Sequence, residues 1–500
     1  MNISSLFLNA AQAYPERIAI IDTKRSIDYS QLAKEVEQTS AYFQRKGIKK
    51  GDRVLVFVPM SVDLYRIVLA LFHCGATAVF LDEWVSKKRM ELCCEIANCK
   101  GFIGVFKARL FSLFSKELRK IPVKLRVKGM LTTTAKQIEM NSEDSALITF
   151  TTGSTGRPKA ADRTHGFLNE QFEALLDEIE PKVEDVDMPV LPIVLFMNLG
   201  IGCTSVIANF KMSKPEQMDI NSIVDQIKLN RVNRITSSPF FITKLAQKST
   251  EHKEVFKQIK KIFTGGAPVF PEQASLYKKA FPNTAVNIVY GSTEAEPISS
   301  IRAEELVLRE AELSEGLPVG KIYRKANVRI IEITEKDIPE ATQDEFMSLL
   351  VKPGVTGEIV VSGAHVLKKY FNNTAAFAAN KITVDDTIWH RTGDSGHIIE
   401  GELFLTGRCK QLIVAGDQLL SPFIIENKIQ EIKGVSMGSL IQVDDKLILA
   451  VETTLPKEEV ITALKNIPFD EVLCMSIPRD PRHNSKIDYP TLEKSIRQIH

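Results

Sequence analysis

The sequence has little net charge, few cysteines and few tryptophans. Its 64 basic and 62 acidic residues leave a formal net charge of +2, which gives no electrostatic case for a nucleic acid partner. Seven scattered cysteines, an odd number without framework spacing, indicate a reducing compartment and a cytoplasmic protein. The 44% apolar and 25% charged residues are typical of a globular protein, and a length of 500 residues predicts at least two domains.

Two apolar stretches resemble membrane signals but lack their defining features. LFLNAAQA, near the start, has no basic region before it and is too short for the core of a signal peptide. Residues 189–210 carry no charge, and their length would suit a membrane span. Because prolines, an asparagine and glycines interrupt this stretch, we expect a buried strand and turn that line a cavity, and no transmembrane segment.

A cysteine cluster at Cys93, Cys94 and Cys99 lacks a nearby histidine and the usual zinc spacing. We therefore expect these thiols to pack a helix and not to bind a metal.

Short β-rich runs alternate with helical patterns through the first two thirds of the chain. DRVLVFVP precedes SVDLYRIVLALFHCG, and IKKIFTGGAPV precedes FPEQASLYKKAFP. This alternation predicts an α/β fold with parallel sheets and crossover helices. GEIVVSG and GELFLTGR predict antiparallel strands, and the chain after Lys410 has a compact α+β pattern.

The stretch FTTGSTGRPKAADRTH, residues 150–165, has the composition of a phosphate-binding loop. It follows the short apolar run SALIT, and its glycines, hydroxyls and amides suit phosphoryl oxygens. It is not a P-loop, because Gly153 and Gly156 are too close together and Lys159 follows a proline. That proline disfavours a helical residue before it, so we expect no helix to begin at this point.

Further motifs follow in order, and each has an ordinary structural explanation as well. TGGAP (264–268) can let a flat base lie against the backbone, or be a turn. In VYGSTEAEP (289–297), Tyr290 can stack on a purine and Glu294 can hold magnesium, which prefers oxygen ligands. Asp394 in HRTGDSGHI can accept both hydroxyls of a ribose, or form a common Asp turn.

Together and in this order, these motifs resemble the superfamily of adenylate-forming enzymes, which includes acyl-CoA synthetases, peptide-synthetase adenylation domains and luciferases. The resemblance covers nearly the whole chain, starting with YSQLAKEVEQTSAYFQRKGIKKGDRVLVFVP. It implies a large N-terminal domain (1–409) of parallel-sheet subdomains with a small β-barrel-like subdomain. It also implies a small, mobile α+β C-terminal domain (410–500) that closes as a lid.

The resemblance also assigns roles to particular positions. The nucleotide contacts it implies are Thr152, Gly153, Ser154, Thr155, Gly156 and Lys159 for phosphate, Gly265, Gly266, Ala267, Pro268, Tyr290, Gly291 and Ser292 near adenine, and Asp394 and Arg408 for ribose. Thr293, Glu294 and Lys486 take catalytic positions, Thr152 and Glu294 take magnesium positions, and Lys410 takes the hinge position. Three departures stand out: Ala160 and Ser485 replace usual glycines, and LPIVLFMNLGIG lacks a histidine common in fatty-acyl members.

The implied reaction is activation of a carboxylic acid by ATP with Mg²⁺, which yields an acyl-adenylate and pyrophosphate. The uncharged 189–210 stretch favours a hydrophobic, fatty acid over an amino acid. AGDQLLSPFIIE resembles the corresponding region of CoA ligases, so CoA is the expected thiol acceptor. RHNSKI and VLPIVLFMNLGIGC also resemble bacterial olefin-pathway β-lactone synthetases, which act on β-hydroxy acids. Transfer to a carrier protein, and a catalytically silent nucleotide-binding protein, remain as alternatives.

Overall fold

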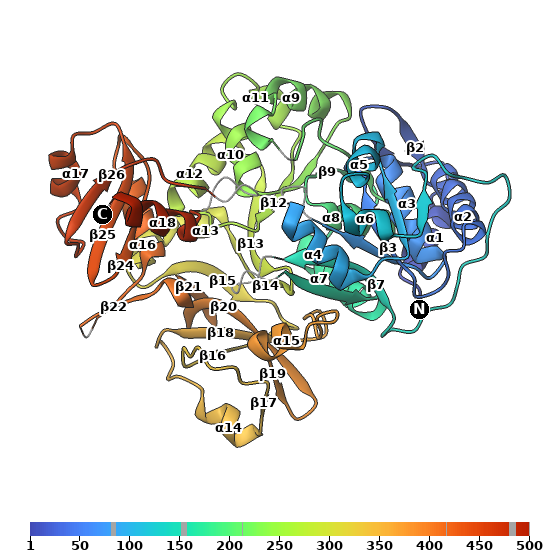
Figure 1. Ribbon diagram of the computed structural model, residues 1–500. Helices are drawn as coiled ribbons and strands as arrows, with labels where there is room; N and C mark the ends of the chain where they lie inside the picture. The colour runs from blue at the N-terminus through green and yellow to red at the C-terminus, as the bar shows by residue number, and fades with distance from the viewer. Residues whose placement is uncertain (82–86, 152–157, 213, 417, 480–486, 500) are drawn as a thin grey trace.

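The computed structural model describes residues 1–81, 87–151, 158–212, 214–416, 418–479 and 487–499. Figure 1 shows the N-terminal helices and first sheet at one side, the C-terminal domain at the other, and an antiparallel lobe below the junction between them. Among these described ranges, no helix combines the length and the apolar character that crossing a membrane requires. The predicted α/β class, with a large N-terminal region and a smaller C-terminal domain, is confirmed.

The first sheet has six strands in the order β6-β5-β3-β4-β7-β8, all parallel except the last pair. Val54 and Val56 of β3 face one core with helices α1 to α3, whereas Leu55 faces a second core with α4. A strand covered on both faces is a continuous apolar run. The strands are β3 (Arg53–Phe57), β4 (Thr77–Phe80), β5 (Gly101–Gly104), β6 (Val123–Leu125), β7 (Ser145–Thr151) and β8 (Lys159–Thr164).

Cys93 and Cys94 are buried on α4 and Cys99 is buried just after it, in the core against Leu55. The prediction that this cluster packs a helix is therefore confirmed.

The second sheet is a long ribbon that changes from parallel to antiparallel pairing at β13. Its parallel half comprises β1 (Ile18–Ile21), β9 (Val186–Pro189), β10 (Thr204–Val206), β11 (Arg234–Ser237), β12 (Lys261–Gly265) and β13 (Ala285–Ser292), with β2 (Ser26–Asp28) at its edge. Its antiparallel half comprises β14 (Ala295–Arg302), β15 (Leu317–Ile322), β16 (Asn327–Ile331), β18 (Gly357–Ser362), β20 (Thr387–Ile399) and β21 (Glu402–Arg408), with β17 (Glu340–Ala341) and β19 (Lys381–Val384) alongside. GEIVVSG and GELFLTGR are antiparallel strands as predicted.

Helices cover both sheets of the N-terminal region, elements α1 to β21 (Figure 1). Three begin at a proline in their first turn, where a missing amide hydrogen costs nothing: α8, α10 and α12. The helices are α1 (Ser4–Ala13), α2 (Tyr29–Arg45), α3 (Val62–His73), α4 (Lys87–Ala97), α5 (Phe106–Ser112), α6 (Lys116–Lys120), α7 (His165–Ile179), α8 (Pro192–Ile201), α9 (Ile220–Leu229), α10 (Pro239–Gln247), α11 (Lys253–Phe256), α12 (Pro271–Ala280), α13 (Ala303–Leu308), α14 (Gln343–Ser348) and α15 (Thr374–Asn380).

The uncharged 189–210 stretch forms mainly a helix, α8, between β9 and β10. The prediction of a strand and a turn was wrong here, because its proline and glycine mark the ends of a helix and do not interrupt it. Pro192 occupies the first turn, and Gly202 ends the helix in the left-handed conformation with φ of 101°. The prediction that this stretch lines a cavity is confirmed below.

The C-terminal domain, elements β22 to α18, has two cores of its own. Its main sheet has the order β24-β25-β26, with a separate hairpin, β22–β23. The elements are β22 (Ile413–Ala415), β23 (Gln418–Leu420), α16 (Pro422–Gln430), β24 (Val435–Val443), β25 (Lys446–Thr453), α17 (Lys457–Ala463), β26 (Glu471–Cys474) and α18 (Tyr489–Ile499).

Candidate active site

The candidate site begins at the carboxyl ends of β12 and β13, where the sheet changes from parallel to antiparallel. Ligands of open α/β sheets bind at such ends. A Cβ on Gly265 would lie 2.4 Å from the carbonyl oxygen of Val289, so only glycine lets the two strands approach. Gly266 has φ of 79° and no atom within 4 Å of the Cβ position. Ala267 and Pro268 continue this edge, half-buried.

Tyr290, Asp394 and Arg408 meet beside this edge. The Tyr290 hydroxyl donates to Oδ2 of Asp394 at 2.8 Å, and Nη1 of Arg408 lies 3.1 Å from Oδ1. Asp394 and Arg408 are cross-strand partners on β20 and β21. The Asp394 carboxylate raises the pKa of Arg408, and burial followed by the same carboxylate raises the pKa of Tyr290 well above its ordinary value.

Tyr290, predicted at the adenine position, and Asp394, predicted at the ribose position, are in direct contact. Tyr290 was expected to stack through its ring, and its hydroxyl also holds the carboxylate assigned to ribose. Each carboxylate oxygen has two lone pairs, so Asp394 can still accept from a ribose hydroxyl.

Glu294 lies in a second cluster, with the half-buried Lys159 and the buried Lys381 near it. The Tyr370 hydroxyl donates to Oε1 of Glu294 at 3.2 Å, and Glu294 is 9% exposed. Nζ of Lys159 donates to Oδ1 of Asn380 at 2.5 Å, and Lys381 donates to the carbonyl of Leu367. Burial lowers the pKa of both lysines, that of Lys381 to about 7, while the Glu294 carboxylate acts in the opposite direction.

The backbone around Glu294 is also held in place. Nη2 of Arg163, from β8, donates to the carbonyl of Thr293 at 3.3 Å, and the amide of Glu294 donates to the Ser292 hydroxyl at 3.3 Å. A Cβ on Gly291 would lie 2.9 Å from the carbonyl oxygen of Ala295, so this hairpin is tight. The β13–β14 turn therefore presents Glu294 at a fixed position.

Sequence reasoning missed Tyr370, Asn380 and Lys381. They come from α15, β19 and the loop before them, far along the chain from Glu294. FAANK matches no motif, and only the folded chain brings it to Glu294.

The residues fit a magnesium site of the kind that relies on substrate phosphates. Among the described residues, no group of three or more acidic, histidine or cysteine side chains gathers as a metal cage. Magnesium commonly takes one or two carboxylates and completes its shell with phosphates and water. Glu294 supplies a buried carboxylate, and the lowered pKa of Lys381 reduces the positive charge that would oppose a metal ion there.

Several predicted residues lie outside the described ranges: Thr152, Gly153, Ser154, Thr155, Gly156 and Lys486. Their flanks are informative. Thr151 pairs with Lys159 across antiparallel β7 and β8, so the segment joins two strands and is not followed directly by a helix, as predicted. The amide of Phe371 donates to the carbonyl of Ala160 at 2.8 Å, which ties the start of β8 to the segment carrying Tyr370.

Lys410 lies in a short 3-10 turn, Cys409–Gln411, between Arg408 and the C-terminal domain. Beyond it, the Ser421 hydroxyl donates to the carbonyl of Thr406 at 2.6 Å, and the Phe423 ring lies 5.2 Å from that of Phe270. A Cβ on Gly407 would lie 2.8 Å from Cβ of Phe423. The C-terminal domain thus packs on β21 and on the start of α12.

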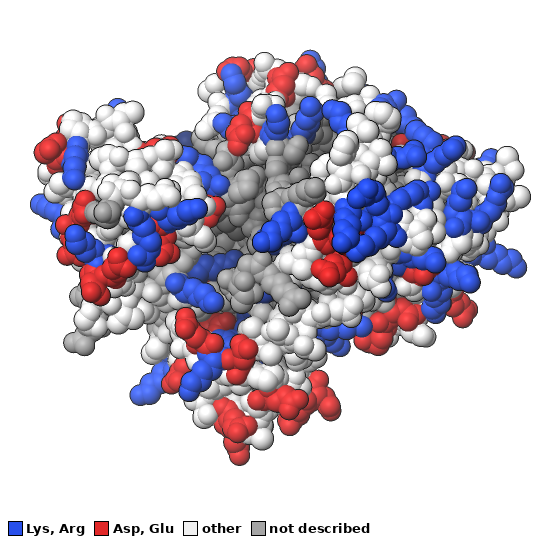
Figure 2. Space-filling model, in the orientation of Figure 1, with Lys and Arg blue, Asp and Glu red and all other residues white. Residues whose placement is uncertain are grey.

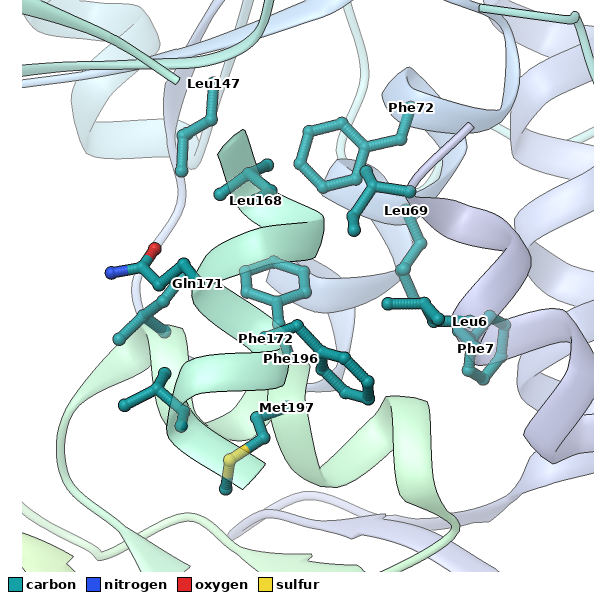
Figure 3. A pocket seen from close by; sticks show the side chains of 13 residues that line it. Leu6, Phe7, Leu69, Phe72, Leu147, Leu168, Gln171, Phe172, Phe196 and Met197 are labelled. Atoms are coloured by element: carbon teal, nitrogen blue, oxygen red, sulfur yellow. The ribbon is translucent and has the colours of Figure 1, made fainter. Parts of the chain in front are cut away.

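An apolar cavity of about 50 Å³ lies between α1, α3, α7 and α8 (Figure 3). Phenylalanines, leucines and Met197 point into it, and Gln171 is its polar member. Met197 also packs with Phe263 of β12 and Val289 of β13, the strands that end at the nucleotide edge. A Cβ on Gly200 would lie 2.6 Å from the Phe172 ring, whereas one on Gly202 would lie 2.5 Å from Tyr14, outside the cavity lining.

Comparisons with known proteins agree with this architecture. The family model described as AMP-binding enzyme matches residues 7–371. An olefin beta-lactone synthetase of Stenotrophomonas maltophilia is 28% identical over 478 residues, covering 88% of this chain and 85% of that protein. A 2-succinylbenzoate–CoA ligase of Bacillus subtilis is 24% identical over 88% of this chain and 85% of its own. The ATP-bound structure of MatB from Rhodopseudomonas palustris superposes with a TM-score of 0.83 at 20% identity, over all of both chains.

Proposed function

This chain belongs to the AMP-binding enzyme family and is an AMP-forming ligase, and we propose that it activates a hydrophobic carboxylic acid with ATP. The observation that carries the proposal is the joined arrangement of Tyr290, Asp394 and Arg408 beside Glu294, at a strand edge next to an apolar cavity. One side of β12 and β13 then serves the nucleotide and the other serves the acid.

The first half-reaction makes a carboxylate a good acyl donor. A carboxylate oxygen attacks the α-phosphorus of ATP, the bond to the pyrophosphate oxygen breaks, and acyl-adenylate and pyrophosphate result. Asp394 and Tyr290 orient the nucleoside, while Lys159 and Lys486 hold anionic oxygens in place as charge develops. Glu294, with Thr152 as the second predicted ligand, would hold magnesium, which would neutralise phosphate charge.

The acid enters through apolar contacts alone in this proposal. The cavity is lined by side chains such as Leu6, Phe172 and Phe196, and none of the described residues that line it carries a charge to pair an α-amine. A cavity of about 50 Å³ is small for a long chain, so we propose that Phe172 or Phe196 rotates to admit the acid. Substitution of either by alanine should favour longer acids, while Phe256→Ala, in a separate core, should leave the chain-length profile unchanged.

For the second half-reaction we propose ring closure of a β-hydroxy acid. The hydroxyl oxygen attacks the acyl carbon, AMP leaves, the hydroxyl proton passes to solvent, and a β-lactone forms. Similarity to the β-lactone synthetase, at 28% against 24% for the CoA ligase, supports this order of preference. Transfer to CoA is the second candidate, supported by Gly416, Ser421 and Pro422; a carrier-protein thiol is a third acceptor.

We also propose that residues 410–500 move as a lid about Lys410 between the half-reactions. The separate cores of the C-terminal domain support such motion. No disulfide joins any of the seven cysteines, all of which lie in the described ranges, in keeping with the predicted cytoplasmic location.

Exchange of labelled pyrophosphate into ATP tests the first half-reaction. Apolar acids should drive exchange, and free amino acids should not. No exchange with any acid of a broad panel would instead favour a catalytically silent nucleotide-binding protein.

Mass spectrometry of products then separates the acceptors. The protein would receive ATP, magnesium and paired plain and β-hydroxy fatty acids, with and without CoA. A product with the mass of the β-hydroxy acid minus the mass of water, formed without CoA, supports lactone closure. If both acids instead give a thioester, and only when CoA is present, the second half-reaction is that of a CoA ligase and the lactone proposal is wrong.

A further inference from the structure

Residues 106–128 concentrate positive charge that the overall balance conceals. This segment contains eight lysines and arginines and one acid, Glu117, whereas the whole chain has a net charge of only +2. It covers α5, α6 and the strand β6 that follows them. Figure 2 shows lysine and arginine side chains gathered where Figure 1 places α5 and α6.

The same segment exposes large apolar side chains, which folded proteins normally bury. Phe106 is 80% exposed, Phe114 69% and Leu113 60%, and Leu110 and Phe111 are exposed beside them. All five lie on α5 or on the link to α6. Contiguous apolar exposure rimmed by charge marks an interaction surface and is not ordinary surface scatter.

Most of these cations have no acidic partner within the described part of the chain. Glu117 pairs with Lys120 at 2.7 Å, and Asp63 pairs with Lys128 at 3.0 Å. Lys107, Arg109, Lys116, Arg119 and Arg126 form no ion pair with a described residue. The positive charge of this surface is therefore available to an anionic partner.

A cleft of about 530 Å³ opens beside Phe106 and extends the basic surface. Lys24, Arg109, Arg126 and Lys128 line it. Its two acids are already engaged. Asp22 accepts from the backbone amides of Lys24, Arg25 and Val62, and Asp63 pairs with Arg66 and Lys128. Such a cleft suits an anionic headgroup next to inserted apolar side chains.

We propose that the 106–128 surface docks on an anionic lipid bilayer. The phenylalanines and leucines enter the boundary between headgroups and acyl chains, while the lysines and arginines contact lipid phosphates. Leu110 and Leu113 favour lipid over nucleic acid, because leucine offers bases no stacking surface. An acidic protein would not require five exposed apolar side chains. The proposal goes beyond the proposed function, since docking needs no catalytic residue.

Vesicle partitioning of the full-length protein tests this surface. Vesicles of phosphatidylcholine alone and of phosphatidylcholine with phosphatidylglycerol are sedimented with the protein at two salt concentrations. We expect partitioning only to the anionic vesicles, and weaker partitioning at high salt. Partitioning to neither kind of vesicle, or equally to both, overturns the proposal.

Two patch variants and two matched controls assign the effect to this surface. Lys107→Glu with Arg119→Glu should weaken partitioning at least about thirtyfold. Each cation near an anionic bilayer contributes about 1 kcal/mol, so loss of two corresponds to a factor of about thirty. Phe106→Ser with Phe114→Ser should weaken it at least about tenfold. Leu229→Ser with Leu308→Ser removes equally exposed apolar groups elsewhere, and Lys253→Glu with Lys260→Glu reverses equally exposed charges; both should partition like the parent.

All variants should retain acid-driven pyrophosphate exchange in vesicle-free buffer. That readout separates failure of docking from failure of the proposed function. If the controls lose partitioning as much as the patch variants, the surface is not a lipid-docking site. The proposal also fails if RNA displaces the parent from anionic vesicles and binds the Phe106→Ser, Phe114→Ser variant as tightly as it binds the parent.

Discussion

The N-terminal region and the C-terminal domain each hold carboxylates that are at least half-buried, but they do so in different ways. In the N-terminal region, Asp394 is paired with Arg408, and Glu294 lies near the half-buried Lys159 and the buried Lys381. In the C-terminal domain, Glu426 accepts from the hydroxyls of Ser439 and Tyr489, and no cation pairs with it among the described residues. The difference fits the proposed role of the first region in holding ATP, whereas the second has cores of its own.

The largest expected effect comes from the lysine that the C-terminal domain is predicted to supply. Lys486→Ala should slow adenylate formation by about 10²–10³, because a positioned donor to developing charge contributes that much. It should leave consumption of premade acyl-adenylate largely intact. Rapid-quench assays of each half-reaction measure both, and Lys494→Ala, an exposed lysine of the same domain, should change neither.

Lys410→Pro should have the opposite effect on the two half-reactions. Proline fixes φ and should block the proposed rotation, so adenylate should form but be consumed slowly. If Lys486→Ala slows both half-reactions equally, the two parts do not divide the chemistry and Lys486 has a structural role.

Next in size is the fixed nucleoside contact of the N-terminal region. Asp394→Ala should weaken ATP binding about tenfold to a hundredfold, since hydrogen bonds to a charged group contribute about 1.5–3 kcal/mol. Tyr290→Phe, which removes one hydrogen bond to this carboxylate, should have a smaller effect. Calorimetric titration measures both. Asp386→Ala, an exposed acid near the same strand, serves as the control, and unchanged affinity in Asp394→Ala would move the ribose contact elsewhere.

The junction between the two parts should show an intermediate effect. Gly407→Val would drive a side chain into Phe423 and displace the C-terminal domain, so adenylate formation should fall about tenfold while ATP binding persists. Gly401→Val serves as the control. It carries a similar backbone strain, because φ is 114° at Gly407 and 82° at Gly401, but a Cβ on Gly401 would have no atom within 4 Å outside the adjacent residues. Equal activity of the two variants would show that the junction contact does not matter.

The sequence predicted those elements whose structure depends on the local pattern of apolar and polar residues. Apolar runs such as those of β3 and β12 are buried on both faces and were identified as strands. The α8 helix was missed because Pro192 and Gly202 are compatible with both a break and a helix boundary. Tyr370 and Lys381 were missed because they reach Glu294 only through tertiary contacts.

The last expected effect concerns stability and not activity: the two parts should differ in pH dependence. Burial lowers the pKa of His73 and His165 in the N-terminal region to about 4, and it raises the pKa of Glu426 in the C-terminal domain to about 7. The histidines are neutral when folded, so the unfolded chain takes up protons as pH falls from about 6.5 to 4, and stability of the first part falls with it. Glu426 is protonated when folded, so the unfolded chain releases its proton as pH rises from about 4.5 to 7, and stability of the second part falls over that window.

Glu426→Gln isolates the C-terminal contribution, because the amide remains neutral at every pH. Relative to the parent, the variant should gain stability as pH rises from about 4.5 to 7, by up to about 3 kcal/mol, and show no further gain above that pH. Amide hydrogen exchange read by mass spectrometry measures this for peptides of β24 and β25, with peptides of β3 and α3 as the internal reference. Comparison of variant and parent at one pH cancels the intrinsic exchange rates. A gain that is the same at pH 5 and pH 8, or one that extends equally to α3, would mean that Glu426 is not the titrating group or that the two parts unfold as one unit.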